Sequence, residues 1–223
     1  MSFKRFKMPG LSARVALDGP ESGFTLVEFL ISILMTSLIV SAIYSIFRVQ
    51  THSVKLQENR LEAQEYTRNV LDIMIREIRN AGYFPVGACT TPANTNGIIT
   101  ADSQTFQFVY DANAANGCAD ADENITYAFA TTGCPAGFGN ITRKEGANAA
   151  QLLTDCNVAT GGFTLTYYAQ NLTTAMSPIV LADIQRVQVT LTVQSKNPDA
   201  QFGGQLNATM TSNADLRNRG LPS

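Results

Sequence analysis

The feature that most constrains this chain is one long apolar segment near its N-terminus. Residues 24–47 read FTLVEFLISILMTSLIVSAIYSIF, and Glu28 is the only charged side chain among them. A helix that spans a bilayer needs about 20 mostly apolar residues, so this segment is long enough to cross a membrane. Its serines and threonines fit that reading, because a helix can bond their hydroxyls to its own carbonyls. Such a helix needs lipid or other helices around it.

Residues 1–23 form a leader in front of this segment. The leader carries four basic side chains, Lys4, Arg5, Lys7 and Arg14. An ordinary secretory signal has a shorter apolar stretch of about 7–15 residues and a small-residue cleavage site after it, and this sequence has neither. A plain membrane anchor fits the length but gives Glu28 no purpose. We therefore expect a leader that is cut before the apolar segment, between Gly23 and Phe24.

The apolar segment continues into an amphipathic helix. No glycine or proline occurs between Phe24 and Ala81, which allows one helix of roughly 85 Å. Gly82 and Pro85 are typical of a helix end. In the second half, apolar residues recur at three- and four-residue steps and predict a stripe that packs on a sheet. The stripe consists of Ala63, Tyr66, Val70, Leu71, Ile73, Met74, Ile75 and Ile78. Asp72 lies four residues before Arg76, a spacing that favours an ion pair.

Four segments alternate apolar and polar residues and predict antiparallel strands with one buried face. They are residues 106–110, 125–129, 163–167 and 187–193. Between them lie stretches rich in Ala, Asn, Gly, Thr and Asp. Two of these, residues 111–124 and 134–160, are expected to be loops. The predicted fold class is therefore α+β, with a long N-terminal helix packed on an antiparallel sheet.

All four cysteines follow the apolar segment. They are Cys89, Cys118, Cys134 and Cys156. No two have C-x-x-C spacing, and the only histidine, His52, cannot complete a zinc site with them. An even number in an exported region predicts two disulfides in an oxidising compartment. Three pairings are possible, and the spacing favours the two local bridges Cys89–Cys118 and Cys134–Cys156.

Composition excludes several functions. Charged residues make up 15 % of the chain, and its formal net charge is −2, so a nucleic-acid partner is not expected. The sequence lacks nucleophile-elbow, Walker and zinc-protease motifs, and no enzyme activity is expected. One acidic loop gathers oxygen ligands of the kind that calcium prefers. Its candidate ligands are Asp120, Asp122 and Glu123. The spacing misses the EF-hand pattern, so we expect a solvated acidic loop and no cofactor.

The residues Gly23-Phe24-Thr25-Leu26-Val27-Glu28, followed by the apolar run, resemble the processing motif of type IV prepilins. This resemblance implies the type IV pilin fold. It implies that a prepilin peptidase cuts after Gly23, where any Cβ would obstruct the protease, and that the new amino group of Phe24 is methylated. It also implies that Glu28 attracts the charged amine of a neighbouring subunit's Phe24. Such a pair would offset the cost of a carboxylate in lipid and fix the axial offset between subunits.

Residues 76–83, REIRNAGY, resemble the end of the long helix in PilW-type minor pilins, and residues 184–193 resemble that group and the J-type pseudopilins of type II secretion. The resemblance implies four parts: a cleaved leader (1–23), a transmembrane or filament-core helix (24–47), an amphipathic helix (48–82) and a periplasmic β-rich head (83–223). It implies a minor pilin of a type IV pilus that acts in initiation of assembly or in the tip complex. The chain would lie in the inner membrane and later in the filament or its tip.

The expected partners are other minor and major pilins, the prepilin peptidase and the inner-membrane assembly platform. Two alternatives stay open. A J-type minor pseudopilin of type II secretion would share the mechanism and differ in its partners. A tip adhesin or DNA-uptake pilin would bind a ligand through its loops, although the few scattered basic residues of the head argue against DNA.

Overall fold

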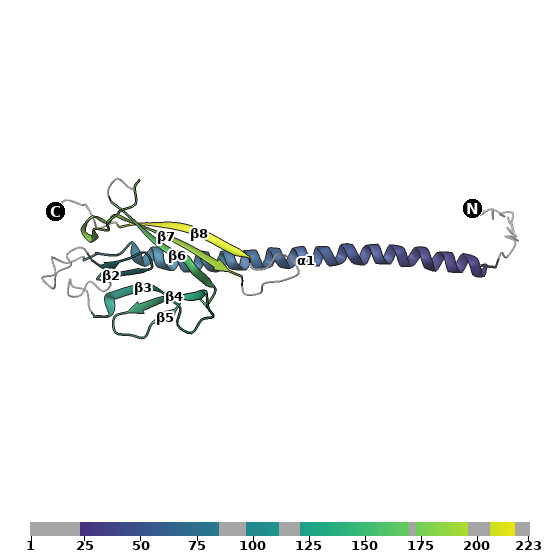
Figure 1. Ribbon diagram of the computed structural model, residues 1–223, viewed down its shortest axis with the longest axis horizontal. Helices are drawn as coiled ribbons and strands as arrows, with labels where there is room; N and C mark the ends of the chain where they lie inside the picture. The colour runs from purple at the N-terminus through teal and green to yellow at the C-terminus, as the bar shows by residue number, and fades with distance from the viewer. Residues whose placement is uncertain (1–22, 85–96, 112–120, 170–172, 196–205, 217–223) are drawn as a thin grey trace, which may run out of the picture. The chain divides into compact units, whose positions relative to one another are not determined.

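The computed structural model of the protein describes residues 23–84, 97–111, 121–169, 173–195 and 206–216. The chain divides into two compact units, Met1–Gln50 and Thr51–Ser223. Helix α1 (Leu26–Ile78) supplies the helical residues of both units (Figure 1). The cysteines Cys89 and Cys118 and the candidate ligand Asp120 lie outside the described residues.

In the first unit, no other described part of the chain covers α1. Every residue from 23 to 50 is exposed. The hydroxyls of this stretch donate to carbonyl oxygens three or four residues earlier, as the sequence predicted. These bonds are 2.7–2.8 Å long and involve Ser32, Thr36, Ser37 and Ser45. The helix therefore satisfies its own polar groups and presents an apolar surface, and it is long and apolar enough to cross a membrane.

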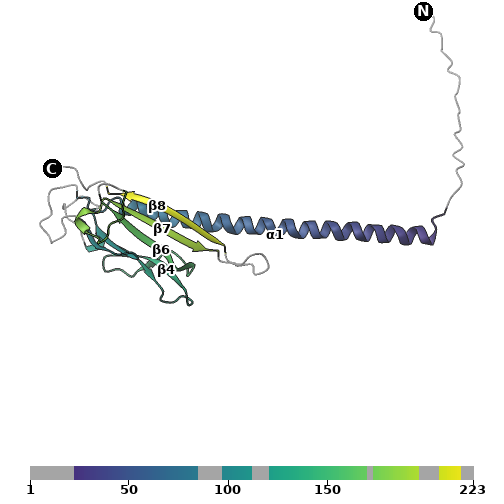
Figure 2. The same ribbon diagram turned by 45° about the horizontal axis from the view of Figure 1, so that its top comes forward.

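In the second unit, an eight-stranded antiparallel sheet packs on the C-terminal half of α1 (Figures 1 and 2). Its strands are β1 (Ile98–Ala101), β2 (Thr105–Val109), β3 (Asn124–Ala130), β4 (Phe138–Glu145), β5 (Gln151–Leu152), β6 (Val158–Tyr168), β7 (Arg186–Gln194) and β8 (Asn207–Asp215). Two short 3₁₀ helices, η1 (Ala121–Glu123) and η2 (Leu181–Asp183), interrupt the connections. The strand order is β1-β2-β3-β4-β6-β7-β8, and β5 pairs with β4. The predicted α+β fold, a long N-terminal helix packed on an antiparallel sheet, is confirmed.

Strand β4 joins the two halves of the sheet. Its first residues, Phe138 and Gly139, pair with β6, whereas its later residues pair with β3 and β5. The turn between β1 and β2 reaches back to β6, where the amide of Leu165 donates to the carbonyl of Ser103 at 2.8 Å. The hydroxyl of Tyr167 donates to the carbonyl of Asp102 at 2.7 Å. The two halves are therefore held together at a second place, far from β4 along the strands.

One apolar core fills the space between α1 and the strands. The helix contributes seven buried residues, Ala63, Thr67, Val70, Leu71, Met74, Ile75 and Ile78. The strands contribute buried aromatic rings, among them Phe106 and Tyr167, whose centroids lie 5.7 Å apart. Fully burying one large apolar side chain stabilises the fold by about 1.5–3 kcal/mol, so this helix face alone is enough to dock α1 on the sheet.

The predicted helix stripe is correct except at one position. Ile73 is 46 % exposed, whereas its neighbour Met74 is fully buried. Successive residues point about 100° apart around a helix, so Ile73 lies beyond the edge of the buried face. Thr67 takes a place in the stripe instead, and its hydroxyl donates to the carbonyl of Ala63 at 2.6 Å. A buried threonine is tolerated because its own helix satisfies the hydroxyl.

The four predicted strands are confirmed as β2, β3, β6 and β7. The prediction of a loop over residues 134–160 is wrong, because β4, β5 and the start of β6 lie there. The sequence of β4, FGNITRKE, lacks apolar alternation, since its inner positions include Gly139 and Asn140. The predicted loop at 111–124 likewise ends in the 3₁₀ helix η1 and the first residue of β3.

Candidate assembly helix and its anchoring contacts

The N-terminus of α1 is capped by Thr25. The threonine Oγ1 accepts a hydrogen bond from the backbone amide of Glu28 at 3.3 Å, and its carbonyl accepts from the amide of Phe29 at 3.1 Å. Glu28 lies in the first turn, where a negative charge interacts favourably with the helix dipole. This cap was not among the predicted features, although the spacing Thr-x-x-Glu is its usual signature. Glu28 therefore has a local role in the isolated chain, whatever it contacts in an assembly.

Gly23 lies just before this cap and is not required by the fold. A Cβ added at Gly23 meets no atom within 4 Å. The residue is exposed, and its backbone is not in the left-handed region. Any need for glycine at this position must therefore come from another molecule, and the prepilin resemblance names a protease as that molecule.

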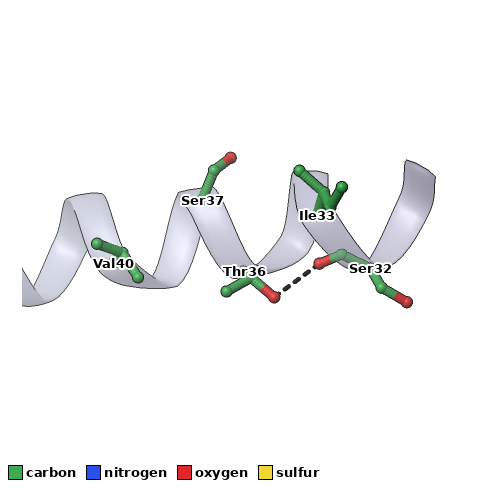
Figure 3. Close-up of a pocket in the computed structure, with 5 residues that line it drawn as sticks. All are labelled: Ser32, Ile33, Thr36, Ser37 and Val40. Carbon is green, nitrogen blue, oxygen red and sulfur yellow. Dashed lines mark hydrogen bonds between the residues drawn. The ribbon is translucent and has the colours of Figure 1, made fainter. Parts of the chain in front are cut away.

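The exposed half of α1 carries a shallow hollow of 370 Å³ on one side (Figure 3). It is lined by Ser32, Ile33, Thr36, Ser37 and Val40. Figure 3 shows the hydroxyl of Thr36 turned back to the carbonyl of Ser32, which leaves the threonine methyl on the surface. Small side chains at four-residue steps let a second helix approach closely. Large apolar side chains cover the rest of this half, and Leu26, Ile39 and Phe47 are all at least 60 % exposed.

In the second unit, three side chains form a polar contact between α1 and the sheet. Arg143 on β4 donates from Nε to both carboxylate oxygens of Glu77 on α1, at 3.1 and 3.0 Å. Tyr127 on β3 donates its hydroxyl to the same carboxylate. The contact is largely shielded, because the side chains of Arg143 and Glu77 are 13 % and 21 % exposed. We call these three residues the helix anchor.

The helix anchor shifts the titration of its own members. Burial, and then the hydrogen bond to Glu77, raises the pKa of Tyr127 far above its usual value. The hydrogen bond to Glu77 raises the pKa of Arg143, although burial opposes this shift. The phenol therefore stays neutral and the guanidinium stays charged at every physiological pH. The sequence gives no sign of the anchor, because Tyr127 and Arg143 are 50 and 66 residues from Glu77 and no local pattern links them.

A second ion pair joins the two last strands on the outer side of the sheet. Arg186 on β7 donates from Nη2 to Asp215 on β8 at 3.2 Å, and its Nε contacts the other carboxylate oxygen. The hydrogen bond from Arg186 lowers the pKa of Asp215. This pair is more exposed than the helix anchor, so solvent screens it and it adds less to stability.

One disulfide lies in the described part of the chain, between Cys134 and Cys156. It is one of the two local pairs that the sequence favours. It connects the turn before β4 to the segment before β6, and the amide of Cys156 donates to the side chain of Asn140 beside it. The bridge therefore holds together the junction at which the two halves of the sheet meet.

The acidic residues do not form a metal centre in the described part of the chain. Asp122 is exposed, and Glu123 is buried with its carbonyl bonded to the amide of Tyr110. Within the described ranges, no three His, Cys, Asp or Glu side chains lie close enough together to hold a metal ion. The third candidate, Asp120, is outside those ranges.

Comparisons with known proteins extend this description. A solved structure of a type IV-like pilin from Thermus thermophilus aligns with 14 % identity and a TM-score of 0.41, over 70 % of this chain and 97 % of that one. A comparison with curated protein sequences finds no match. A family model described as prepilin peptidase-dependent protein B matches residues 55–213.

The matched region begins in the second half of α1 and ends within β8, so it contains the helix anchor, the disulfide, strands β1 to β7 and most of β8. It does not include the motif at residues 23–28, which stands as separate evidence. The family model matches well over half of the chain, and this chain therefore belongs to the prepilin peptidase-dependent protein B family.

Proposed function

We propose that the protein is a PilW-like minor pilin of a type IV pilus, and that it acts in initiation of pilus assembly or in the tip complex. In this role it is a structural, non-catalytic subunit and requires no cofactor. It is inserted in the inner membrane with its head in the periplasm. After a prepilin peptidase removes residues 1–23, α1 joins other pilin helices, and the protein passes into the filament or its tip.

One observation carries the proposal. The apolar residues 24–47 are exposed throughout, so no described part of the chain buries any of them. An apolar surface of this size is stable only in lipid or against other protein helices. The predicted cleavage site lies directly before this surface, which supports a helix that is first held in a membrane and then released into an assembly.

Glu28 is the residue that we expect to set the position of the subunit. A carboxylate at this depth costs about 3 kcal/mol on insertion scales, and a partner amine removes part of that cost. We propose that the partner is the methylated amine of Phe24 on a neighbouring subunit. The cap by Thr25 supports this role, because it fixes the first turn from which Glu28 projects.

Mass spectrometry of the protein from assembled filaments tests processing. The proposal expects a chain that starts at methylated Phe24. Gly23→Ala should abolish cleavage while the head folds as before, because the added methyl meets nothing in this chain. Filaments that contain the chain with an intact Met1 would refute the proposed processing.

Incorporation into filaments tests Glu28. Glu28→Gln should insert in the membrane, fold and be cleaved, but it should not enter filaments. Glu65→Gln, another exposed glutamate of α1, is the matched control and should be incorporated normally. Normal incorporation of Glu28→Gln would remove the registration role and leave only the helix cap.

The alternative of a J-type minor pseudopilin uses the same helix in the same way, so its partners distinguish it. Co-purification from cells that make both machineries should recover pilus subunits and the pilus assembly platform. Recovery of secretion pseudopilins instead would support the alternative. Binding of a surface ligand by the head alone would support the adhesin-like pilin.

A further inference from the structure

In the described part of the chain, β1 and β8 lie at the two ends of the strand order, and they differ in how well they are protected. β1 has four residues, and its register to β2 shifts between Ile98 and Thr100. β8 has nine residues and pairs with β7 without any shift from Asn207 to Asp215. In the described part of the chain no strand lies on its other side. Short, irregular edges resist pairing with another strand, whereas long, regular ones accept it.

The sequence of β8 also lacks the residues that usually block an edge. It reads NATMTSNAD, with no proline, lysine or arginine. Natural edge strands usually place a proline, a charge or a bulge in such a stretch to prevent addition of another chain. The one charged side chain, Asp215, lies at the end of the strand and is held by Arg186. Among the described residues, most of the edge therefore remains open to main-chain pairing.

A groove of 470 Å³ runs between this strand and the last turns of α1. Figures 1 and 2 show β8 beside this part of the helix in both views. The groove is lined by Asp72, Ile75, Arg76, Arg79, Asn80 and Ser212. Ser212 shares the inner face of β8 with Met210, which packs against the core. A strand added to β8 would therefore point every second side chain into the groove, towards α1.

The groove offers two guanidinium groups. The ion pair that the sequence favours between Asp72 and Arg76 does not form, and among the described residues neither Arg76 nor Arg79 uses its guanidinium in a hydrogen bond or ion pair. Guanidinium groups bind carboxylates with paired hydrogen bonds. Arg76 and Arg79 are both exposed, so their guanidinium groups are accessible to such a ligand. The open strand edge and the two cations together select an extended peptide that carries carboxylates.

We propose that the groove between β8 and α1 binds an extended, acidic segment of a neighbouring subunit, which adds to the sheet as a ninth strand. The segment carries carboxylates at alternate positions, so that they meet Arg76 and Arg79. The proposal rests on the proposed function for one point only, the identity of the partner as another subunit of the assembly. Binding by strand addition is one of the common modes of peptide recognition.

The β8 strand of a second copy is a poor occupant of the same groove. In an antiparallel pair of β8 strands centred on Thr211, the residue opposite Ser212 is Met210 and the residue opposite Asp215 is Asn207. Asp215 of one strand lies opposite Ser212 of the other only in a register that pairs residues 212–215 alone. That register leaves residues 207–211 of both strands unpaired. The charge of the groove therefore favours a different segment.

Selection from a library of random nine-residue peptides on the full chain in detergent micelles tests the proposal. The selected peptides should share acidic residues at alternate positions. Hydrogen exchange with the best peptide should show new protection of amides within 207–215. Peptides without this pattern, protection confined to another element, or failure to select any peptide would each overturn the proposal.

Substitutions in the groove complete the test. Arg76→Glu combined with Arg79→Glu should weaken binding of the best peptide by about tenfold or more, and the milder Arg76→Gln with Arg79→Gln should also weaken it. Arg68→Glu is the matched control, because Arg68 is exposed on the same helix and does not line the groove. Equal binding by the variants and the control would refute the proposal. Peptide binding does not involve residues 1–47, so its failure would leave the proposed pilus role untouched.

Discussion

Arg143 on β4 places its Nε 3.1 and 3.0 Å from the two carboxylate oxygens of Glu77 on α1. This contact joins elements that are 66 residues apart and lies at the edge of the apolar core. Tyr127 donates to the same carboxylate, and Arg143 also donates to Glu145 at 3.0 Å. The apolar face of α1 supplies most of the attraction to the sheet. The helix anchor adds direction, because a helix that rotated or slid by one residue would break all of its bonds.

Glu77→Gln should lower the free energy of unfolding of the head by about 2 kcal/mol, because it leaves the shielded guanidinium of Arg143 without its main partner. Urea unfolding of the full chain in detergent, followed by circular dichroism, measures this loss. The exposed control Glu65→Gln should change stability by less than about 0.5 kcal/mol. The double variant Glu77→Gln, Arg143→Met should lose less stability than the sum of the losses in the two single variants, since both substitutions remove the same contact. Fully additive losses would show that Glu77 and Arg143 do not stabilise the head through their mutual contact.

Alkaline pH should destabilise the head through its buried tyrosines. The folded state raises the pKa of Tyr127 and of Tyr167 above the ordinary value of 10.0, in both cases first through burial. Below that value both states keep their phenol protons, and the stabilisation is complete. As the pH rises past it, the unfolded chain loses protons that the folded chain keeps, so the free energy of unfolding falls.

Urea unfolding between about pH 9 and pH 11 should therefore show stability declining with pH, and Tyr127→Phe should make the decline shallower. A slope that Tyr127→Phe leaves unchanged would mean that the phenol ionises equally well in the folded state.

Alanine substitutions at two glycines with similar φ angles should distinguish the cost of backbone strain from the cost of a steric clash. Gly97 has a φ of +71° and Gly133 a φ of +80°, a region that disfavours other residues. A Cβ at Gly97 would lie 2.2 Å from the Cα of Gly82, whereas a Cβ at Gly133 meets nothing within 4 Å. Gly133→Ala should cost about 1 kcal/mol, from backbone strain alone. Gly97→Ala should cost about 3 kcal/mol or more, because the end of α1 must move. Equal losses would contradict the close approach of these two segments.

The disulfide between Cys134 and Cys156 should stabilise the head by about 3 kcal/mol, since it closes a loop with a sequence separation of 22. Replacing both cysteines by serine should lower the urea midpoint accordingly. Non-reducing peptide mapping should recover this bridge and, as the sequence predicts, a second one between Cys89 and Cys118. A bridge between Cys89 and Cys134 would contradict both the structure and the predicted pairing.

The elements that could be predicted are those whose own residues repeat with the period of the element. α1 has no helix breaker and a clear apolar stripe, and β2, β3, β6 and β7 alternate large apolar side chains with polar ones. β4 and β8 were missed because small or polar residues occupy their inner positions. Such strands are stabilised by their neighbours in the sheet, and propensity gives little sign of them.

The sequence by itself determined that this protein is built around an apolar helix with one acidic side chain at its start, and it showed the resemblance of residues 23–28 to a prepilin processing motif, because each of these signals lies within a few neighbouring residues. Only the tertiary structure decided how the helix is held, through Glu77, Tyr127 and Arg143. It also decided that β8 ends the strand order of the described sheet beside two arginines. Those relationships join residues far apart in the chain. Their partners are set by packing and strand order, which no local pattern encodes.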